Sequence, residues 1–153
     1  MRQLLLILTL LVSMAAKAQN ADALYEEGKA LYDKKEYAAA IEKLRPAAEK
    51  GHKMAQYRLG RCYDKGRGVE ESNDEAFKWY SKSADQGYYK AEYQLARCYL
   101  KGKGVTASPS KAKTWVKRAI SGKKHGGEMF LEISEGAAGG DKTDQELLKL
   151  LGR

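Results

Sequence analysis

The chain has 153 residues, of which 43% are hydrophobic and 31% are charged, and its formal net charge is +8. This length corresponds to one small domain. After the first 18 residues, no hydrophobic segment approaches the ~20 residues that a membrane-spanning helix needs. The excess positive charge is spread among interleaved Glu and Asp and is not gathered in blocks.

The N-terminus has the pattern of a secretory signal. Arg2 precedes an apolar run from Leu4 to Met14, and Ala16-Lys17-Ala18 supplies small residues around a cleavage point. We predict cleavage after Ala18 and a periplasmic or secreted bacterial protein; an uncleaved N-terminal anchor is the alternative. Loss of Arg2 and Lys17 would lower the net charge from +8 to +6. Because an exported protein rarely meets nucleic acid, we expect an acidic protein, a peptide carboxylate or an anionic envelope polymer as partner.

Residues 19–153 are predicted to form one repeat domain, whose first unit spans about 20–54. A helix from about Asn20 to Tyr32 leads through a short turn into a second helix from about Tyr37 to Lys50. Pro46 lies late in the second helix and should bend it. The small and apolar residues of this second helix recur 36 positions later in the chain, which marks it as part of a repeat.

The next two units, about 55–90 and 91–126, repeat at a period of 36 residues. Residues 55–69 return as 91–105, with ten of the fifteen positions identical. A fixed period of this size indicates stacked supersecondary units. Each unit contains two helices, joined by a Gly-x-Gly loop at 66–68 or 102–104. Ser72 and Ser108 are the predicted N-caps of the second helices.

A degenerate cap is predicted over 127–153. Gly127–Leu131 aligns with Ala91–Leu95, and residues 136–140 are expected to form a loop. Thr143 and Glu146 form a candidate capping box for a short helix ending at Gly152. Terminal repeats are atypical because one of their faces meets water. The predicted fold is an all-α solenoid of stacked antiparallel helix pairs.

The repeated residues resemble the Sel-one-like repeat, a branch of the tetratricopeptide-repeat superfamily. The pattern is Ala-x-x-x-Leu-Gly-x-x-Tyr-x-x-Gly-x-Gly-Val from Ala55 to Val69, continued by Ala76, Trp79, Tyr80, Ser83, Ala84 and Gly87. The resemblance extends over 55–122, is partial over 21–54 and is weak after 126. It implies a right-handed solenoid that acts as a scaffold or adaptor in protein complexes. Some cysteine-rich members are linked to β-lactam binding through cysteines paired within one repeat. This chain has one cysteine in each of two repeats, so that activity is not transferred.

Those two cysteines, Cys62 and Cys98, occupy equivalent positions. Equivalent helices in stacked units lie ~8–10 Å apart, whereas a disulfide needs Cα atoms within ~7 Å. We therefore expect two small buried thiols in the repeat core and no bridge between them.

In stacks that resemble the tetratricopeptide repeat, the first helix of each pair lines the concave face. Each first helix here carries a tyrosine and a cation spaced i, i+4, so that both share one helical face. Rings and cations stacked along a groove would suit an extended ligand with carboxylates. In the alternative interpretation the tyrosines pack between helices and the cations are solvated. The predicted partner-binding residues are Tyr25, Lys29, Tyr57, Arg61, Tyr93 and Arg97. Tyr63, Tyr99, Trp79 and Trp115 are assigned to packing.

Signals for catalysis are weak. His52 and His125, the only histidines, lie near repeat junctions without a second ligand at metal spacing. Ser-x-x-Lys sequences begin at Ser108, Ser110 and Ser121, within a lysine-rich stretch that lacks the partner motifs of penicillin-interacting enzymes. We predict no enzyme activity, no metal and no cofactor. The predicted function is that of an exported scaffold that binds a protein or peptide. The alternatives are a small periplasmic hydrolase or β-lactam-binding protein, and a purely structural part of an envelope complex.

Overall fold

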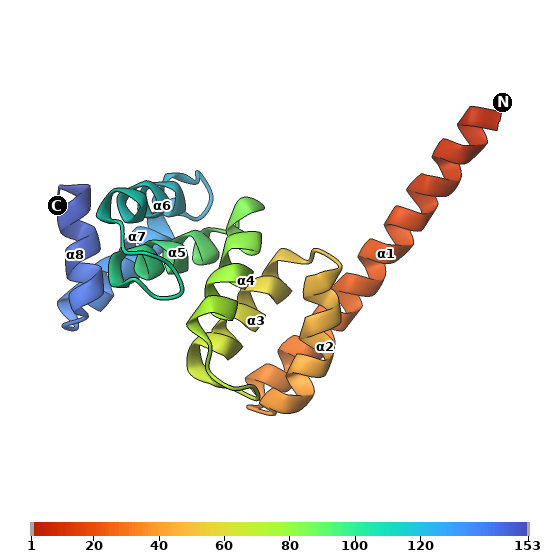
Figure 1. Ribbon diagram of the computed structural model, residues 1–153. Coiled ribbons are helices and arrows are strands. Elements are labelled where there is room, and N and C mark those ends of the chain that lie inside the picture. Colours follow the sequence, from red (N-terminus) through yellow and green to blue (C-terminus); the bar gives the residue numbers. More distant parts are fainter. Residues whose placement is uncertain (1, 153) are drawn as a thin grey trace.

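The computed structural model describes residues 2–152, which form eight α-helices and no strand. Figure 1 shows the helices stacked along one direction, so the predicted all-α solenoid is confirmed. Met1 of the predicted signal and Arg153 of the predicted cap lie outside the described residues. The helices are α1 (Arg2–Asp33), α2 (Tyr37–Glu49), α3 (Lys53–Lys65), α4 (Asn73–Asp85), α5 (Tyr89–Lys101), α6 (Pro109–Ser121), α7 (Gly126–Ala138) and α8 (Lys142–Leu151).

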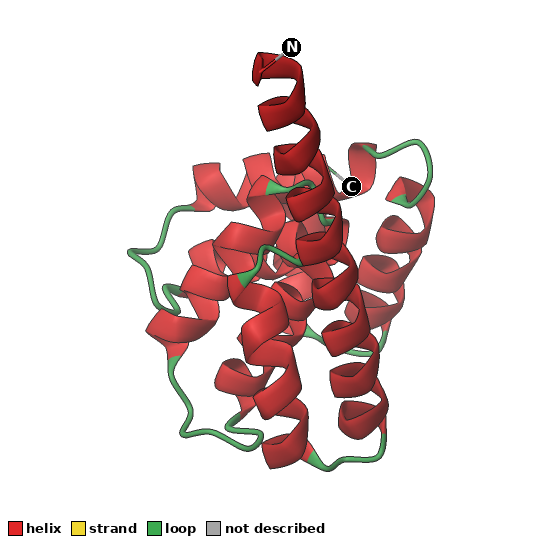
Figure 2. Cartoon of the chain, turned by 90° about the vertical axis from the view of Figure 1, so that its right-hand side faces the viewer, coloured by secondary structure: helices red, strands yellow, loops and turns green. Residues whose placement is uncertain are grey.

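The helices pack as pairs in chain order: α1 with α2, α3 with α4, α5 with α6, and α7 with α8. Successive pairs meet through α2 against α3 and through α4 against α5. Figure 2 shows that the connecting loops lie at the ends of these pairs. The second helix of one unit is thereby buried between the two helices that flank it in the chain.

The N-terminal part of α1 differs from the prediction. A helix was expected to begin near Asn20, but α1 runs without a break from Arg2 to Asp33, because the apolar segment is itself helical and continues into the first unit. Figure 1 shows this end of α1 projecting beyond the other helices. Ala21 is the first side chain of α1 that is described as buried. In the part of the chain that the structure covers, no helix combines the length and apolarity required to cross a membrane.

A small residue on each first helix allows close packing within a pair. A Cβ at Gly60 would lie 2.7 Å from Cδ1 of Tyr80, and a Cβ at Gly28 would lie 2.8 Å from Cγ of Leu44. In the third unit Ala96 and Val116 belong to the same buried cluster. In the first and second units a glycine on the first helix therefore accommodates a large side chain on the second. In the third unit the larger Ala96 is accompanied by the smaller Val116. Complementary sizes of this kind keep the interior densely packed.

The second glycine of each Gly-x-Gly loop packs against the preceding unit. A Cβ at Gly68 would lie 2.7 Å from the carbonyl carbon of Tyr37, and one at Gly104 would lie 2.7 Å from that of Asn73. Both glycines also adopt positive φ, at 73° and 65°. Glycine is required here because no side chain fits between the loop and the neighbouring backbone.

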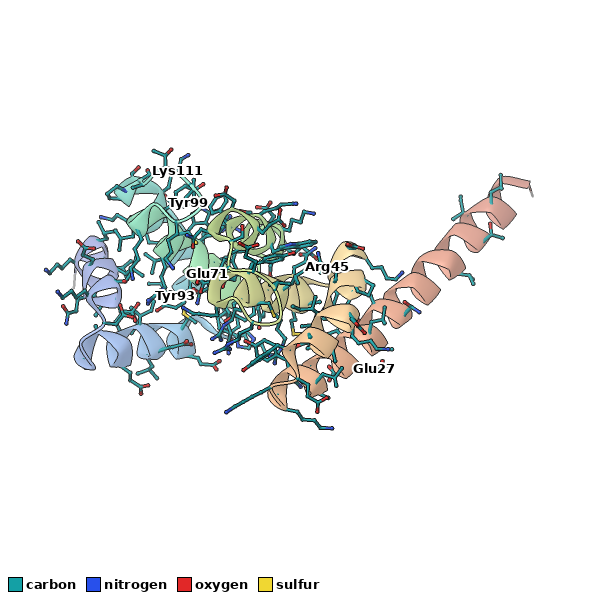
Figure 3. The ribbon with its side chains drawn as sticks, turned by 60° about the horizontal axis from the view of Figure 1, so that its bottom comes forward. Glu27, Arg45, Glu71, Tyr93, Tyr99 and Lys111 are labelled. Carbon is teal, nitrogen blue, oxygen red and sulfur yellow. The ribbon has the colours of Figure 1, made fainter. Side chains whose placement is uncertain are left out.

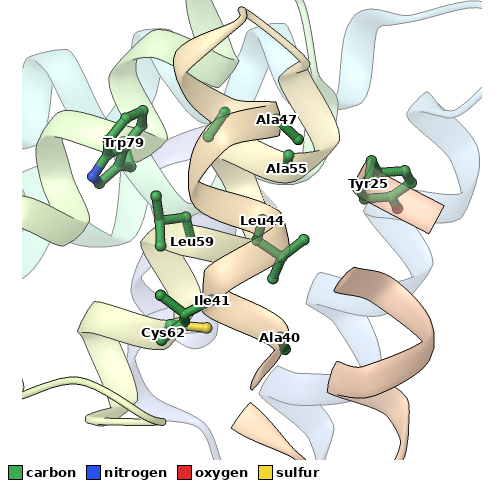
Figure 4. Close-up of a cluster of buried hydrophobic side chains, with 10 residues drawn as sticks. Tyr25, Ala40, Ile41, Leu44, Ala47, Ala55, Leu59, Cys62 and Trp79 are labelled. Carbon is green, nitrogen blue, oxygen red and sulfur yellow. The ribbon is translucent and has the colours of Figure 1, made fainter. Parts of the chain in front are cut away.

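The core between α2, α3 and α4 is built mainly from Ala, Leu and aromatic side chains (Figure 4). Trp79 is 4% exposed and belongs to this core, whereas Trp115 is only partly buried. Cys62 and Cys98 are both buried, as predicted. Burial raises the pKa of Cys62 to about 11 and that of Cys98 to about 12, so both stay protonated at neutral pH.

The predicted N-caps of the second helices are confirmed. Ser72 accepts a hydrogen bond from the Glu75 N–H at 3.2 Å, and Ser108 accepts one from the Lys111 N–H at 3.4 Å. Each satisfies a backbone donor that the first turn leaves without an intrahelical acceptor. Because Ser108 performs this structural task, its Ser-x-x-Lys sequence has a local explanation.

Two predictions for the cap are wrong. Residues 136–138 belong to α7, so the loop before α8 is much shorter than expected. The N-cap of α8 is Asp141 and not Thr143: its Oδ1 accepts from the N–H groups of Thr143 at 2.8 Å and Asp144 at 3.2 Å. Thr143 is instead 2% exposed beneath the helix start. The Thr–Glu spacing fits a capping box, but Asp is at least as good an N-cap and lies two residues earlier.

The predicted register of α7 is also wrong. Alignment at the 36-residue period places Leu131 at the core position of Leu95, yet Leu131 is 61% exposed. Met129 and Ile133, spaced i, i+4, are fully buried instead. α7 packs against α5, α6 and α8 at the end of the stack, and in this environment Met129 and Ile133 enter the core in place of Leu131.

Candidate partner-binding cleft

A cleft of about 410 Å³ lies between α3, α5 and the C-terminal cap formed by α7 and α8. It contains four of the six predicted partner-binding residues: Tyr57 and Arg61 from α3, and Tyr93 and Arg97 from α5. Tyr80 of α4 also lines it. The other charged residues of its lining are Asp64, Lys65, Lys101, Lys103, Glu132, Asp141 and Asp144.

In the third unit, the Tyr–Arg pair binds carboxylates from the cap. The Tyr93 hydroxyl donates to Oδ1 of Asp144 at 2.5 Å, and Nη1 of Arg97 donates to the same oxygen at 2.8 Å. Nη2 of Arg97 donates to Oδ2 of Asp141 at 2.9 Å. Figure 3 labels Tyr93 where α5 meets the C-terminal helices. One guanidinium therefore joins both carboxylates of the α8 N-terminus to α5.

Asp141 and Arg97 are both charged at neutral pH. Burial acts to raise the pKa of Asp141, but the Arg97 guanidinium and the N–H groups of Thr143 and Asp144 outweigh it and hold the pKa well below its usual range. Burial acts to lower the pKa of Arg97, and hydrogen bonds to Asp141 and Tyr93 raise it overall. The Asp144 side chain is 5% exposed. Arg97 therefore forms one ion pair with the buried Asp144 and one with the more exposed Asp141, and together these hold α8 against α5.

In the second unit, the equivalent Tyr–Arg pair has different neighbours. Burial acts to lower the pKa of Arg61, but the electrostatic effect of the nearby Tyr57 hydroxyl helps to raise it overall. Tyr57 packs edge-on to Tyr88, with ring centroids 5.2 Å apart. Among residues 2–152, no carboxylate forms an ion pair with Arg61. Arg61 is thus a half-buried cation in the cleft whose identified polar partner is a tyrosine.

Tyr80 places a hydroxyl beneath this pair. Its side chain is 1% exposed, and within the described range its hydroxyl makes no hydrogen bond. Burial raises its pKa well above the usual value. At the equivalent positions the first and third units have Leu44 and Val116, which carry no polar atom. A buried, unpaired hydroxyl costs about 1–3 kcal/mol, so packing alone does not explain a tyrosine here.

The first-unit pair lies outside the cleft. Tyr25 is 5% exposed, stacks on His52 with ring centroids 4.3 Å apart, and accepts a 3.5 Å hydrogen bond from Nε of Arg58. Lys29 lies 3.7 Å from the Glu26 carboxylate at the surface. These contacts agree with the alternative interpretation of the sequence, in which the tyrosine packs between helices and the cation is at the surface. The structure therefore brings together the second and third pairs only.

Three of the cleft residues that were not predicted from the sequence matter most for the site: Tyr80, Asp141 and Asp144. The helical periodicity placed Tyr80 on the inner face of its helix. Periodicity does not indicate whether a buried hydroxyl has a hydrogen-bond partner. Asp141 and Asp144 have a local signal, since two acids three residues apart favour a helix N-terminus. Their pairing with Arg97, more than forty residues away, has no sequence signal.

The histidines have structural places at the repeat junctions, as predicted. Nδ1 of His52 accepts the Ala55 N–H at 3.1 Å and caps α3. His125 stacks on Tyr89 with ring centroids 4.6 Å apart. In the described part of the chain, no group of three His, Cys, Asp or Glu side chains could hold a metal ion.

The Sel1 repeat model matches residues 53–88 and 90–123, which are the second and third units. These two segments of the chain are therefore Sel1 repeats. Proteins built from Sel1 repeats generally mediate protein–protein interactions and are typically non-catalytic scaffolds. This match agrees with the helix pairs of the second and third units and with their Gly-x-Gly loops, each of which packs on the unit before it.

Three known proteins are similar to this Sel1 repeat chain. A Sel1 repeat protein from Oxalobacter formigenes has a TM-score of 0.64 and 30% identity, over 76% of this chain and 46% of that one. A protective antigen of uropathogenic Escherichia coli strains with an SLR fold has a TM-score of 0.67 and 25% identity, over 92% and 32%. An exopolysaccharide production negative regulator of Rhizobium meliloti (strain 1021) is 42% identical over 60 residues. This chain spans 22% of that regulator and less than half of either solved structure.

Proposed function

We propose that this protein is a non-catalytic scaffold that binds an acidic segment of another protein in the cleft between α3, α5 and the cap. The observation that carries the proposal is Arg61, a half-buried cation beside Tyr57 for which the described chain supplies no carboxylate. Such a cation is stabilised when a partner provides an anion and excludes water from the pair. The net charge, +8 for the full chain and +6 without Arg2 and Lys17, favours an acidic partner on approach.

We further propose that the protein acts outside the bacterial cytoplasm, with residues 1–18 removed. Supporting this, the small-x-small sequence ends at Ala18, and the first side chain described as buried is Ala21. Leu6, Ile7 and Val12 of the projecting segment are more than half exposed. Cleavage after Ala18 would therefore leave the described core intact. The intact mass of the protein isolated from its own cells tests this proposal; a mass that includes residues 1–18 would contradict it.

Site-specific cross-linking tests the cleft as the binding surface. A photo-reactive amino acid at Gln94, which lines the cleft, should form a cross-link to a defined protein in cells. Arg61→Glu should abolish that product, because it reverses the charge that faces the partner. The matched control is Lys117→Glu, the same charge change at an exposed position on α6. Equal cross-linking in both variants, or no protein product from Gln94, would contradict the proposal.

The Rhizobium meliloti relative is named as a regulator of exopolysaccharide production, and this role is not part of the proposal for this chain. The 60 matched residues cover 39% of this chain and a minor part of that protein. The chemistry of the cleft therefore remains the basis of the proposal.

A further inference from the structure

We infer that Tyr57, Arg61 and Tyr80 form a carboxylate site for an acidic helix N-terminus of the partner protein, built on the same plan by which Tyr93 and Arg97 bind the N-terminus of α8. The inference rests on the proposed function and specifies the chemical group that the cleft recognises.

The internal template for this site is the contact between α5 and α8. A tyrosine hydroxyl and an arginine four residues later both donate to one oxygen of Asp144, at 2.5 and 2.8 Å. The same guanidinium donates through Nη2 to Asp141, the N-cap of that helix. Two carboxylates spaced i, i+3 at the start of a helix therefore fit one Tyr–Arg pair. The backbone N–H groups of Thr143 and Asp144 stabilise the negative charge of Asp141.

The second unit contains the same Tyr–Arg pair that binds the carboxylates in this contact. Tyr57 and Arg61 precede Tyr93 and Arg97 by one repeat and lie on the equivalent helix, in the same cleft. The nearby Asp64 carboxylate is engaged by Lys65 at 3.2 Å and Lys103 at 3.4 Å. Glu132 also lines the cleft and acts on the pKa of Tyr57, but it forms no ion pair with Arg61 in the described structure. A carboxylate bound to Arg61 would therefore come from another molecule.

Tyr80 is an independent observation that points to a ligand. Its ring is buried against the position of Gly60, and its hydroxyl is a donor without a partner in the described structure. Phenylalanine would fill the same space without that cost. A carboxylate that enters between α3 and α5 can accept from Tyr80 as well as from Arg61, and Val116 gives the third unit no such donor.

The partner chemistry follows from the template. The expected occupant is the first turn of a helix with acidic residues at the N-cap and three residues later, as in Asp141-Lys142-Thr143-Asp144. Lys65 and Lys101 also line the cleft and provide further positive charge for such a segment. A neutral helix start offers only uncharged acceptors to these donors, and a basic one offers no acceptor at all.

A peptide that reproduces residues 139–151, acetylated and amidated, is the probe. We expect the full chain to bind it in fluorescence polarisation, and to lose binding when both aspartates of the peptide are replaced by asparagine. Arg61→Gln should weaken binding by about tenfold or more, because a charged hydrogen-bond partner is removed. Lys117→Gln is the matched control and should leave binding unchanged.

Tyr80→Phe separates recognition from packing. It retains the ring, so the stability of the free protein should be unchanged or higher, while peptide affinity should fall by about threefold to tenfold. Unchanged affinity in Tyr80→Phe removes that hydroxyl from the site. Unchanged affinity in Arg61→Gln overturns the inference.

Two further outcomes would overturn the carboxylate site. If hydrogen exchange shows that α8 loses protection when the peptide binds, the peptide has replaced α8 at Arg97. If Gln94 cross-links to a partner protein but the acidic peptide does not bind, the proposed function stands without this site. Failure of the cross-linking experiment alone would instead count against the proposed function.

Discussion

The second and third repeats carry the same Tyr–Arg pair on equivalent helices, but the two pairs have different roles. Arg97 is bound by Asp141 and Asp144 of the cap, whereas Arg61 has no acid in the described chain. The difference does not come from either repeat, because the residues are identical. It comes from the end of the stack, where α8 contacts α5 and supplies the anions. Position in a solenoid therefore determines whether a repeated residue stabilises the fold or faces a partner.

The largest expected effect is a difference between two arginine truncations. Arg97→Ala should reduce the free energy of unfolding by about 2–3 kcal/mol, because it leaves the buried Asp144 carboxylate without its cation. The lower part of the usual range applies since Arg97 is itself 23% exposed. Arg61→Ala should cost less than about 1 kcal/mol. Urea unfolding measures both, and hydrogen exchange should show local loss of protection in α8 for Arg97→Ala only. Equal losses would show that the two pairs are structurally equivalent.

A second comparison concerns the packing between the helices of a pair. Gly60→Ala should destabilise the second unit by about 1–3 kcal/mol, because the added Cβ would overlap the Tyr80 ring. Combined with Tyr80→Val, which recreates the Ala96–Val116 arrangement of the third unit, the alanine should no longer be unfavourable. A double-mutant cycle by urea unfolding measures this coupling, which we expect to exceed about 1 kcal/mol. Additive effects would mean that the two positions do not fit each other as described.

The smallest expected effect depends on pH and distinguishes the N-caps of α3 and α5. Burial lowers the pKa of His52 in the folded protein, although Asp22 and Glu26 favour the charged ring. His52 therefore contributes stability that is present above its unfolded pKa of about 6.5 and is lost as pH falls below it. Protonation also removes the Nδ1 acceptor for the Ala55 N–H, so we expect a loss of up to about 1 kcal/mol.

Substitution tests this assignment directly. Tyr88, the N-cap of α5, makes no side-chain capping hydrogen bond. His52→Tyr makes the second unit resemble the third and should remove the part of the pH dependence between pH 7 and 5 that belongs to His52. His125→Tyr is the matched control and should retain it. Thermal unfolding at several pH values is the measurement, and an unchanged profile in His52→Tyr would exclude His52 as the source.

The family and the helix pairs could be predicted because their signals are local or periodic. Ser72 and Ser108 cap the helices that follow them, and Gly68 and Gly104 lie where a loop touches the previous unit. The candidate site was only partly predictable. Tyr57, Arg61, Tyr93 and Arg97 share the cleft, but Tyr25 and Lys29 do not, because similar spacing along a helix does not report which neighbours surround it.

The amino-acid sequence by itself determined the repeat period, the two-helix units, the serine caps and the small residues between paired helices. These features depend on interactions within a few residues or on a motif that occurs twice. Only the tertiary structure decided the register of α7, the cap at Asp141 and the pairing of Arg97 with α8. The hydrogen bonds of Arg97 join segments more than forty residues apart, at a stack end where the period no longer holds. Their free energy depends on how the last helices pack, which no local pattern encodes.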